Sequence, residues 1–322
     1  MSQATKGFAL ITGASSGIGA IYADRLAKRG YDLFLVARRF NRLRRLADKI
    51  AGETGRKVEV IAADRVKRKD LAKVEAVLRT DKRITTLVND AGVASTTPLL
   101  QADVDKMSEL IALNVDALTR LTFAAAPGFV ERGGGTIINI ASAVALAPWI
   151  FNGVYGASKA FVVAFSRSLK QELAEKGVRV QVVLPGVTAT DLWVTTDTPL
   201  KQMPGEIVMS ATAMVDAALA GLDQGEFATL PSLPNVADWN AYEAALQALL
   251  PNLSRVEPSA RLTEASHQPT ALHPNNDMQT AIAAEIATAV LGMELVTPPD
   301  AASSNPSSKP HVLPQVRKRQ DL

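Results

Sequence analysis

A tyrosine and a lysine four residues apart, Tyr155 and Lys159, are the side chains best suited to acid–base chemistry in this sequence. Residues 154–176 have the pattern of a helix, so the two side chains share one face of it. A phenol with a pKa near ~10 needs roughly 4 kcal/mol of selective phenolate stabilisation to titrate near pH ~7. An ammonium group about 4–5 Å away supplies roughly 3–4 kcal/mol at an effective dielectric of about 20. The pair therefore suffices for proton transfer near neutral pH.

A glycine-rich loop, residues 12–19, connects a predicted strand to a predicted helix. Glycines permit a tight turn there and let a pyrophosphate approach the backbone and the positive end of the helix. A plain turn is the alternative, but the position between strand and helix favours nucleotide binding. The residues expected to hold the nucleotide are Gly13, Ser15, Ser16, Gly17, Ile18 and Gly19.

Two arginines, Arg38 and Arg39, follow the second predicted strand. An acid at this place would bind the hydroxyls of the adenosine ribose and repel a 2′-phosphate, whereas guanidinium groups make forked hydrogen bonds to phosphate. The sequence therefore favours NADP(H) over NAD(H), with Arg38 the first candidate and Arg39 the second. The alternative is a solvated basic helix face, to which we also assign Arg42, Arg44 and Arg45.

Strand and helix patterns alternate along the first 230 residues. Fully apolar strands between amphipathic helices predict a parallel sheet with helices on both faces. The expected class is therefore α/β, with the doubly wound order of a Rossmann fold. The expected strands are 8–11, 33–36, 58–61, 87–88, 136–140, 178–184 and 227–230, and the expected helices are 17–29, 41–54, 68–79, 103–131, 154–176 and 210–224.

The composition of the chain changes after about residue 231. We expect one domain over 1–260, with a substrate loop at about 187–209 and a further helix over 236–250. The remainder, 261–322, is expected to be a C-terminal extension. Its residues 277–295 carry a helical apolar stripe, and the Pro-, Ser- and Asn-rich chain from about 296 predicts a disordered tail.

The composition also argues against several other classes of site. The chain has 322 residues and no cysteine, which excludes disulfides and thiolate sites. Its three histidines all lie in the last quarter, which counts against a Ser-His-Asp hydrolase and against a histidine-ligated metal, so we expect no metal site. The net charge of +3 gives no reason to expect a nucleic-acid partner, and the chain is expected to be cytoplasmic.

One uncharged stretch, residues 133–158, is long enough to span a bilayer. It contains Asn139, Pro148, Asn152 and several glycines, which are typical of a buried strand followed by a loop. No membrane span is therefore expected.

The spacing Gly-x-x-x-Gly-x-Gly of residues 13–19 resembles that of the short-chain dehydrogenase/reductase family. The other motifs of that family follow in order over about residues 5–260: Asp64, Asn89-Asp90-Ala91-Gly92, Asn114, Ser142, Tyr155 to Lys159 and Pro185-Gly186. The family usually has asparagine where this chain has Asp90, and an apolar residue where it has Arg65. The resemblance implies a Rossmann fold that binds one NADP(H) per chain, in a homodimer or homotetramer.

The resemblance also implies a role for each matching residue. Ser142 would hydrogen-bond the substrate oxygen, Tyr155 would donate or accept the proton, Lys159 would hold the nicotinamide ribose, and Asn114 would support a proton relay through water. Asp64 would contact the adenine. The other cofactor contacts would be Asp90, Ala91, Gly92, Pro185, Gly186, Thr188 and Thr190. Taken alone, each catalytic candidate could have a purely structural role instead, as a loop serine, a capping asparagine or a core aromatic residue.

The motifs together predict an oxidoreductase that moves a hydride between NADP(H) and a small-molecule carbonyl or secondary alcohol. Apolar side chains in 143–151 and 187–209 favour an apolar ketone or aldehyde as substrate. A 3-oxoacyl thioester reductase is a narrower alternative. A nucleotide-sensing binding protein with little turnover, suggested by Asp90 and Arg65, is an alternative of another class. Nucleic-acid binding through the arginines and residues 317–319 is the third.

Overall fold

The computed structural model describes residues 5–196, 199–259, 262, 293–295 and 316–318. The chain divides into two compact units, Met1–Pro231 and Ser232–Leu322. The expected limits of the domain, 1–260, and of the extension, 261–322, stay a prediction.

A parallel sheet runs through the first unit and has seven strands in the described part of the chain, in the order β3-β2-β1-β4-β5-β6-β9. Its strands are β1 (Phe8–Thr12), β2 (Asp32–Ala37), β3 (Val58–Ala62), β4 (Ile84–Asn89), β5 (Gly135–Ile140), β6 (Val178–Val183) and β9 (Ala228–Thr229). The strand order reverses between β1 and β4, as in a doubly wound sheet. The predicted α/β class and Rossmann order are therefore confirmed.

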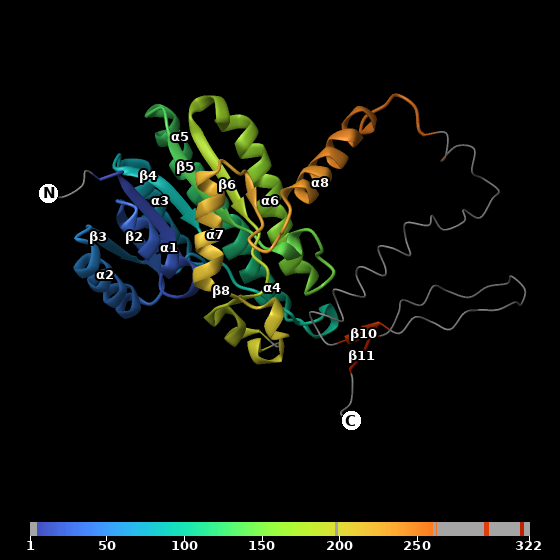
Figure 1. The fold of residues 1–322 in the computed structure, drawn as a ribbon, viewed down its shortest axis with the longest axis horizontal. Helices are drawn as coiled ribbons and strands as arrows, with labels where there is room; N and C mark the ends of the chain where they lie inside the picture. The colour runs from blue at the N-terminus through green and yellow to red at the C-terminus, as the bar shows by residue number, and fades with distance from the viewer. Residues whose placement is uncertain (1–4, 197–198, 260–261, 263–292, 296–315, 319–322) are drawn as a thin grey trace, which may run out of the picture. The chain divides into compact units, whose positions relative to one another are not determined.

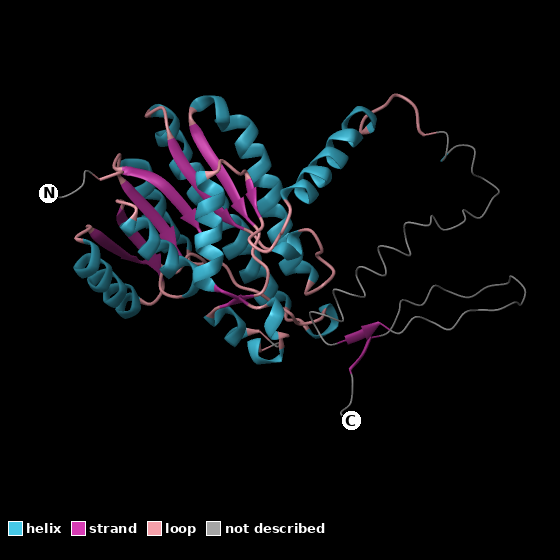
Figure 2. Ribbon diagram, viewed as in Figure 1, coloured by secondary structure: helices cyan, strands magenta, loops and turns pink. Residues whose placement is uncertain are grey.

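Helices cover both faces of this sheet (Figures 1 and 2). One face carries α1 (Gly17–Lys28), α2 (Phe40–Thr54) and α7 (Ala211–Asp223), and the other carries α3 (Arg68–Thr80), α5 (Leu118–Glu131) and α6 (Gly153–Leu173). Alternate strand residues enter the two apolar cores: Ala9 and Ile11 enter one, and Phe8 and Leu10 enter the other. The central strands β1 and β2 are buried on both faces, which explains their mostly apolar sequences, whereas the edge strand β3 is partly exposed and carries Glu59.

The helix expected over 103–131 consists of three consecutive segments. α4 (Val104–Ile111) begins at the Asp103 cap, a π-helix (Ala112–Ala117) follows, and α5 continues to Glu131. Asn114 lies buried inside the π-helix. Such wide turns frequently occur at functional sites. The sequence did not predict this one, because the helical pattern of apolar residues continues through it.

The expected substrate loop has structure of its own. Its ends form two short parallel strands, β7 (Thr188–Ala189) and β8 (Met209–Ser210). Between them, Trp193 and Met203 are buried in one apolar cluster, against which Phe151 packs. The Trp193 Nε1 atom donates to the Thr188 carbonyl at 2.8 Å, and the Trp193 ring meets that of Phe151 edge-on with centroids 6.1 Å apart. The loop therefore has a small apolar core.

The second unit contains α8 (Val236–Leu249), which confirms the helix expected over 236–250. Two short strands, β10 (Met293–Leu295) and β11 (Val316–Lys318), pair antiparallel in the same unit. The end of the helix expected over 277–295 and three residues of the expected disordered tail are therefore strands, and both expectations were wrong there. Local periodicity could not show this pairing, because each strand satisfies its backbone groups with a partner some twenty residues away. The rest of both predictions lies outside the described residues.

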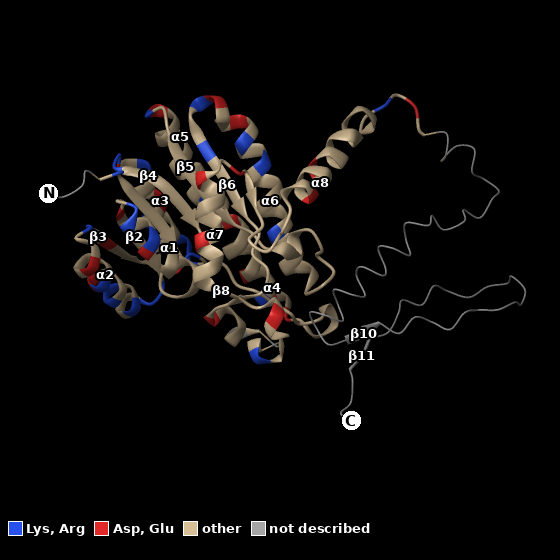
Figure 3. Cartoon of the chain, in the orientation of Figure 1, with Lys and Arg blue, Asp and Glu red and all other residues tan. Residues whose placement is uncertain are grey.

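Charged side chains lie mainly on the helices and loops, and the strands of the large sheet carry few of them (Figure 3). On one face of the sheet, Arg25 of α1 pairs with Asp216 of α7 at 2.6 Å, and Arg29, directly after α1, pairs with Asp223 of α7 at 2.8 Å. Among the residues that the structure describes, no helix combines the length and the apolar character needed to cross a membrane.

Candidate active site

The expected catalytic and cofactor-binding residues gather at the carboxyl ends of three neighbouring strands. The glycine loop follows β1, residues 90–92 follow β4 and Ser142 follows β5, while Tyr155 and Lys159 lie on α6. In open α/β sheets, ligands bind at this edge where the strand order reverses, which here is between β1 and β4. The fold therefore brings most of the predicted site together at the expected place.

Two glycines of the loop are required by its geometry. Gly13 adopts a left-handed conformation with φ of +73°. A Cβ atom on Gly19 would lie 2.8 Å from the Gly13 carbonyl oxygen and 2.7 Å from the Asp90 carboxylate. The side chain of Ser16 does not cap α1, and the first turn of that helix contains no acidic residue. The start of α1 thus has the close backbone packing and partial positive charge that a phosphate group requires.

Thr12 ties the glycine loop to the segment after β4. Its hydroxyl accepts hydrogen bonds from the backbone N–H groups of Asp90 (3.1 Å) and Ala91 (3.2 Å) and donates to the Val88 carbonyl (3.3 Å). Thr12 is not among the residues that the sequence predicts for the site. The sequence around a threonine at the end of an apolar strand does not indicate a hydrogen-bond partner 76 residues away.

Arg38 and Arg39 lie exposed after β2. Within the described residues, no ion pair engages either side chain. Of the neighbouring arginines, Arg42 pairs with Asp191 of the substrate loop (3.2 Å) and Arg44 pairs with Asp48 along its own helix (3.3 Å). The two guanidinium groups expected to bind phosphate are therefore exposed and available for an anion.

Asp64 and Arg65 follow β3. The Asp64 carboxylate accepts a hydrogen bond from the Val66 N–H at 3.3 Å. Arg65 is buried, and neither its Nε nor its Nη1 atom has a hydrogen-bond partner. Burial lowers the pKa of Arg65 to about 10, against the attraction of Asp90. A buried guanidinium group with unused donors is rare in folded proteins.

Asp90 lies between two cationic side chains. Burial raises its pKa to about 7, although Lys159, Arg65 and the Gly19 N–H all favour the charged form. Burial lowers the pKa of Lys159 to about 8, and Asp90 opposes that shift. The Lys159 ammonium group donates to the Ile140 carbonyl at 3.0 Å. Arg65 therefore partly balances the charge that Asp90 introduces.

Tyr155 is buried in the first turn of α6, near the Ser142 side chain. The Ser142 hydroxyl donates to the Pro185 carbonyl at 3.4 Å. Burial raises the pKa of the Tyr155 phenol, and the neighbouring Ser142 side chain opposes this shift. The lowering expected from Lys159 was therefore wrong for the chain by itself. The Lys159 ammonium group donates its hydrogen bond to the Ile140 carbonyl, and burial of the phenol is the largest influence on the pKa of Tyr155.

Asn114 connects the π-helix to two other parts of the site. Its amide donates to the Val93 carbonyl (3.0 Å) and to the Ser158 hydroxyl (3.0 Å), and it accepts from the Val93 N–H (3.0 Å). Ser158 in turn donates to the Tyr155 carbonyl at 2.7 Å. A Cβ atom on Gly92 would lie 3.0 Å from the Asn114 Oδ1 atom. These four residues therefore form one connected group next to Tyr155.

Asn152 positions the start of α6. Its Oδ1 atom accepts from the N–H groups of Val154 (2.9 Å) and Tyr155 (3.3 Å), and its Nδ2 atom donates to the Thr97 carbonyl (2.6 Å). Asn152 is not among the residues that the sequence predicts for the site. Its capping role could have been predicted, because asparagine is a preferred residue immediately before a helix.

The segment after β6 reaches the glycine loop. Thr188 is buried and its hydroxyl donates to the Gly186 carbonyl at 3.1 Å. A Cβ atom on Gly17 would lie 3.2 Å from the Cγ2 atom of Thr190. Thr190 therefore packs directly against the loop expected to hold the nucleotide.

Known proteins resemble this chain in both sequence and structure. A family model described as short chain dehydrogenase matches residues 7–200. The chain is 38% identical over 190 residues to the very-long-chain 3-oxoacyl-CoA reductase of Anas platyrhynchos. That match covers 58% of this chain and 61% of the relative, so the chain spans about three fifths of that relative's length.

Two solved structures have the same fold over nearly their whole length. The NADPH complex of a short-chain dehydrogenase from Sphingobium yanoikuyae is 44% identical with a TM-score of 0.77, covering 79% of this chain and 99% of that one. The bulky-bulky ketone specific alcohol dehydrogenase from Comamonas testosteroni is 40% identical with a TM-score of 0.74, covering 80% of this chain and 99% of that one. The chain therefore belongs to the short-chain dehydrogenase family.

Proposed function

We propose that this protein is an NADP(H)-dependent oxidoreductase that interconverts a carbonyl and an alcohol. The observation that carries the proposal is the proximity of the Ser142 and Tyr155 side chains at the carboxyl ends of the strands, beside the glycine loop. Lys159 lies one helical turn further along the same face of α6. A proton donor and a nucleotide-binding loop thus lie side by side, as hydride transfer to a carbonyl requires.

The residues around the glycine loop fit a nicotinamide dinucleotide. Exposed Arg38 and Arg39 would hold a 2′-phosphate, Asp64 would meet the adenine, and residues 90–92 would line the adenosine ribose. When bound, the nicotinamide supplies the hydride in reduction or takes it up in oxidation. The Sphingobium relative is described in complex with NADPH, which supports NADP(H) rather than NAD(H) for this chain.

Residues of the chain itself would transfer the proton to or from the substrate oxygen. Ser142 would bind the substrate oxygen, and Tyr155 would give that oxygen its proton in reduction or remove one in oxidation. Because burial raises the pKa of the phenol, Tyr155 keeps its proton at neutral pH, which suits the reducing direction. Lys159 would hold the nicotinamide ribose, and Asn114 would support a proton relay through water.

Apolar side chains beside Tyr155 favour an apolar ketone or secondary alcohol as substrate. Val144 is buried with Tyr155, and Phe151 and Val154 pack against the pair. The Comamonas relative is described as specific for bulky-bulky ketones, which supports this substrate class. A 3-oxoacyl thioester is the second candidate, favoured by the similarity to the Anas reductase. Assays on aryl ketones and on 3-oxoacyl thioesters separate the two, and activity on small charged acids alone would contradict both.

Nucleotide titration of the purified chain, followed by fluorescence, tests the proposal first. NADPH should bind more tightly than NADH, and Arg38→Asp should abolish that preference because it places a carboxylate where the 2′-phosphate is held. Arg44→Asp is the matched control, since Arg44 pairs with Asp48 on the surface of α2. Failure of the wild-type chain to bind either nucleotide would overturn the proposal.

Tyr155→Phe separates an enzyme from a nucleotide-sensing protein with little turnover. The substitution removes only the hydroxyl, so NADPH should still bind while turnover falls by about 100-fold or more. A wild-type chain that binds NADPH but turns over no ketone or thioester faster than the variant would favour the sensing function.

We also propose that the chain forms a homodimer or homotetramer. Phe123 on α5 and Phe161 on α6 are 67% and 38% exposed, and both stack on Phe165, with ring centroids 6.3 and 5.7 Å apart. Exposed aromatic clusters of this kind are typical of protein interfaces. Light scattering should show an oligomer that Phe123→Glu dissociates, and a monomeric wild type would contradict the proposal. The cytoplasmic location stays a prediction of the sequence.

A further inference from the structure

An ion pair joins two segments that follow strands far apart in the sheet. Arg42, in the first turn of α2, donates from its Nη1 atom to the Asp191 carboxylate at 3.2 Å. Arg42 follows β2 and Asp191 follows β6, and the sheet order places β1, β4 and β5 between these two strands. Neighbouring strands lie about 4.8 Å apart, so β2 and β6 are separated by roughly 19 Å. The chain after β6 therefore returns across the carboxyl ends of the three central strands to reach α2.

The first part of the substrate loop, residues 187–195, is held at two places, and we call it the strap. One place is the ion pair with α2. The other is the start of α1, because a Cβ atom on Gly17 would lie 3.2 Å from the Thr190 Cγ2 atom. Thr190 also caps the short helix that begins at Asp191, so its packing on Gly17 fixes the place of that helix. The strap therefore runs from the glycine loop to α2.

The strap lies across the path that a bound dinucleotide would follow. The proposed cofactor extends from Arg38 and Arg39, directly before α2, past the glycine loop to Tyr155 on α6. Both places that hold the strap, the start of α1 and the start of α2, lie along this path. A cofactor in this position would be covered by the strap, and its release would require the strap to move.

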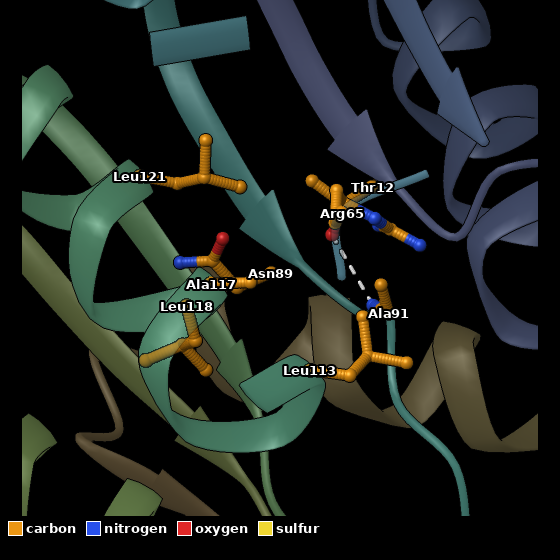
Figure 4. Close-up of a pocket in the computed structure, with 8 residues that line it drawn as sticks. All are labelled: Thr12, Arg65, Asn89, Ala91, Leu113, Ala117, Leu118 and Leu121. Carbon is orange, nitrogen blue, oxygen red and sulfur yellow. Dashed lines mark hydrogen bonds between the residues drawn. The ribbon is translucent and has the colours of Figure 1, made fainter. Parts of the chain in front are cut away.

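The two sides of this nucleotide groove are held differently. Its floor is fixed by internal hydrogen bonds, such as the one that the Ala91 N–H donates to the Thr12 hydroxyl at 3.2 Å, which joins the ends of β1 and β4 (Figure 4). The strap is tied to α2 by Arg42 and Asp191, whose side chains are 43% and 60% exposed. Exposed ion pairs contribute little free energy and are easily broken. The strap is therefore the side of the groove that can open at small cost.

The charges near the strap explain why Asp191 needs a partner. A dinucleotide carries several negative charges, which an unpaired Asp191 carboxylate beside the groove would repel. Arg42 balances this carboxylate at short distance. Arg38 and Arg39 are exposed and are left to bind a 2′-phosphate. Arg42 thus acts on Asp191, while its two neighbours face the cofactor.

We propose that the Arg42–Asp191 ion pair is a clasp that holds the strap over the bound cofactor and slows its release. The inference rests on the proposed nucleotide binding. Arg42 and Asp191 are positioning residues, because they act on the cofactor through the strap. A weak clasp suits an enzyme, since the product nucleotide must leave in every turnover.

Stopped-flow displacement of NADPH from the full chain measures the release rate. Asp191→Asn keeps the size of the side chain and removes its charge, so release should become about 2- to 5-fold faster. Arg42→Asp places two carboxylates together and should speed release at least as much. The double exchange of Arg42→Asp with Asp191→Arg restores a pair of opposite charges and should bring the rate back to within about twofold of wild type. Arg44→Asp, the same change at a pair within α2, should leave the rate unchanged.

Limited proteolysis tests the clasp without any nucleotide. A protease of broad specificity, with the fragments identified by mass spectrometry, should cut residues 187–195 faster in Asp191→Asn than in wild type, because the strap opens more often. The double exchange should return cleavage towards the wild-type rate, and Arg44→Asp should not alter it. Equal cleavage of the strap in wild type and Asp191→Asn would overturn the clasp.

The outcomes separate this inference from the proposed function. A wild-type chain that binds NADPH, with single variants that release it at the wild-type rate, overturns the clasp alone. Slower release from Asp191→Asn also overturns it, because the freed Arg42 would then be a ligand of the 2′-phosphate. A double exchange that releases NADPH as fast as Arg42→Asp overturns it as well, since pairing is what the clasp requires. A wild-type chain that binds neither NADPH nor NADH overturns both proposals.

Discussion

Replacing Asn152 with alanine should weaken both the fold and the proposed catalysis. The Asn152 side chain caps α6 through the N–H groups of Val154 and Tyr155 and also donates to the Thr97 carbonyl at 2.6 Å. Loss of an N-cap costs about 1 kcal/mol, and loss of the bond to Thr97 adds about 0.5–1.5 kcal/mol. Because the residue is only 4% exposed, water replaces these bonds poorly. We expect the free energy of unfolding to fall by about 2 kcal/mol.

Urea unfolding followed by circular dichroism measures this change. Asp103→Ala is the matched control, because Asp103 caps α4 through the Asp105 N–H (2.8 Å) but is exposed to solvent. Its loss should cost about 1 kcal/mol or less. Equal destabilisation by the two substitutions would show that the bond from Asn152 to Thr97 contributes nothing.

The same variant should affect turnover more than nucleotide binding. Tyr155 lies in the helical turn that Asn152 caps, and misplacement of a reacting group by about 1 Å can cost 10²-fold in rate. We expect kcat to fall by about 10- to 100-fold while the dissociation constant of NADPH changes by less than about threefold. An unchanged kcat in Asn152→Ala would refute the reasoning that the cap positions Tyr155.

Three further predictions follow from the geometry. Gly19→Ala places a Cβ atom 2.7 Å from the Asp90 carboxylate, so it should abolish nucleotide binding in a fluorescence titration; tight binding by the variant would contradict the close packing of the loop. Asp90→Asn should gain stability over wild type as the pH rises from about 4 to 7. The folded pKa of Asp90, about 7, lies above its usual 3.8, so the fold disfavours the charged carboxylate, and an equal difference in urea unfolding at pH 5 and pH 8 would disprove this. Trp193→Ala should cost about 3–5 kcal/mol by emptying the cluster beside Phe151, and should speed proteolysis within 187–209; cleavage at the wild-type rate would argue against a packed loop.

The sequence predicted the features that depend on local pattern and failed at those that depend on distant contacts. The apolar runs around Leu10 and Ile138 predicted strands buried on both faces, and the structure has them in the expected order. The close approach of Tyr155 to Ser142 followed from the family motifs. The raised pKa of Tyr155 did not follow, because burial depends on how α6 packs and not on the i, i+4 spacing to Lys159.

The hydrogen bonds of Thr12 show the same limit. They join residues at the ends of β1 and β4, and the local sequence of neither segment indicates which residue it will contact. The unused donors of Arg65 are likewise visible only once the neighbours of its side chain are known. The sequence could show that Arg65 departs from the family pattern, but not that it is buried.

The π-helix at Ala112–Ala117 sets a limit on chain length at this place. A π turn contains about one residue more than an α turn, and each residue of an α-helix turns the chain by about 100°. The extra residue is absorbed within the wide turn, so α4 and α5 keep nearly the relative rotation that a continuous α-helix would give them. Deleting one residue of the turn should therefore leave the outward direction of Phe123 nearly unchanged. It should move Asn114 out of the wide turn and so away from Val93 and Ser158, which it contacts through hydrogen bonds.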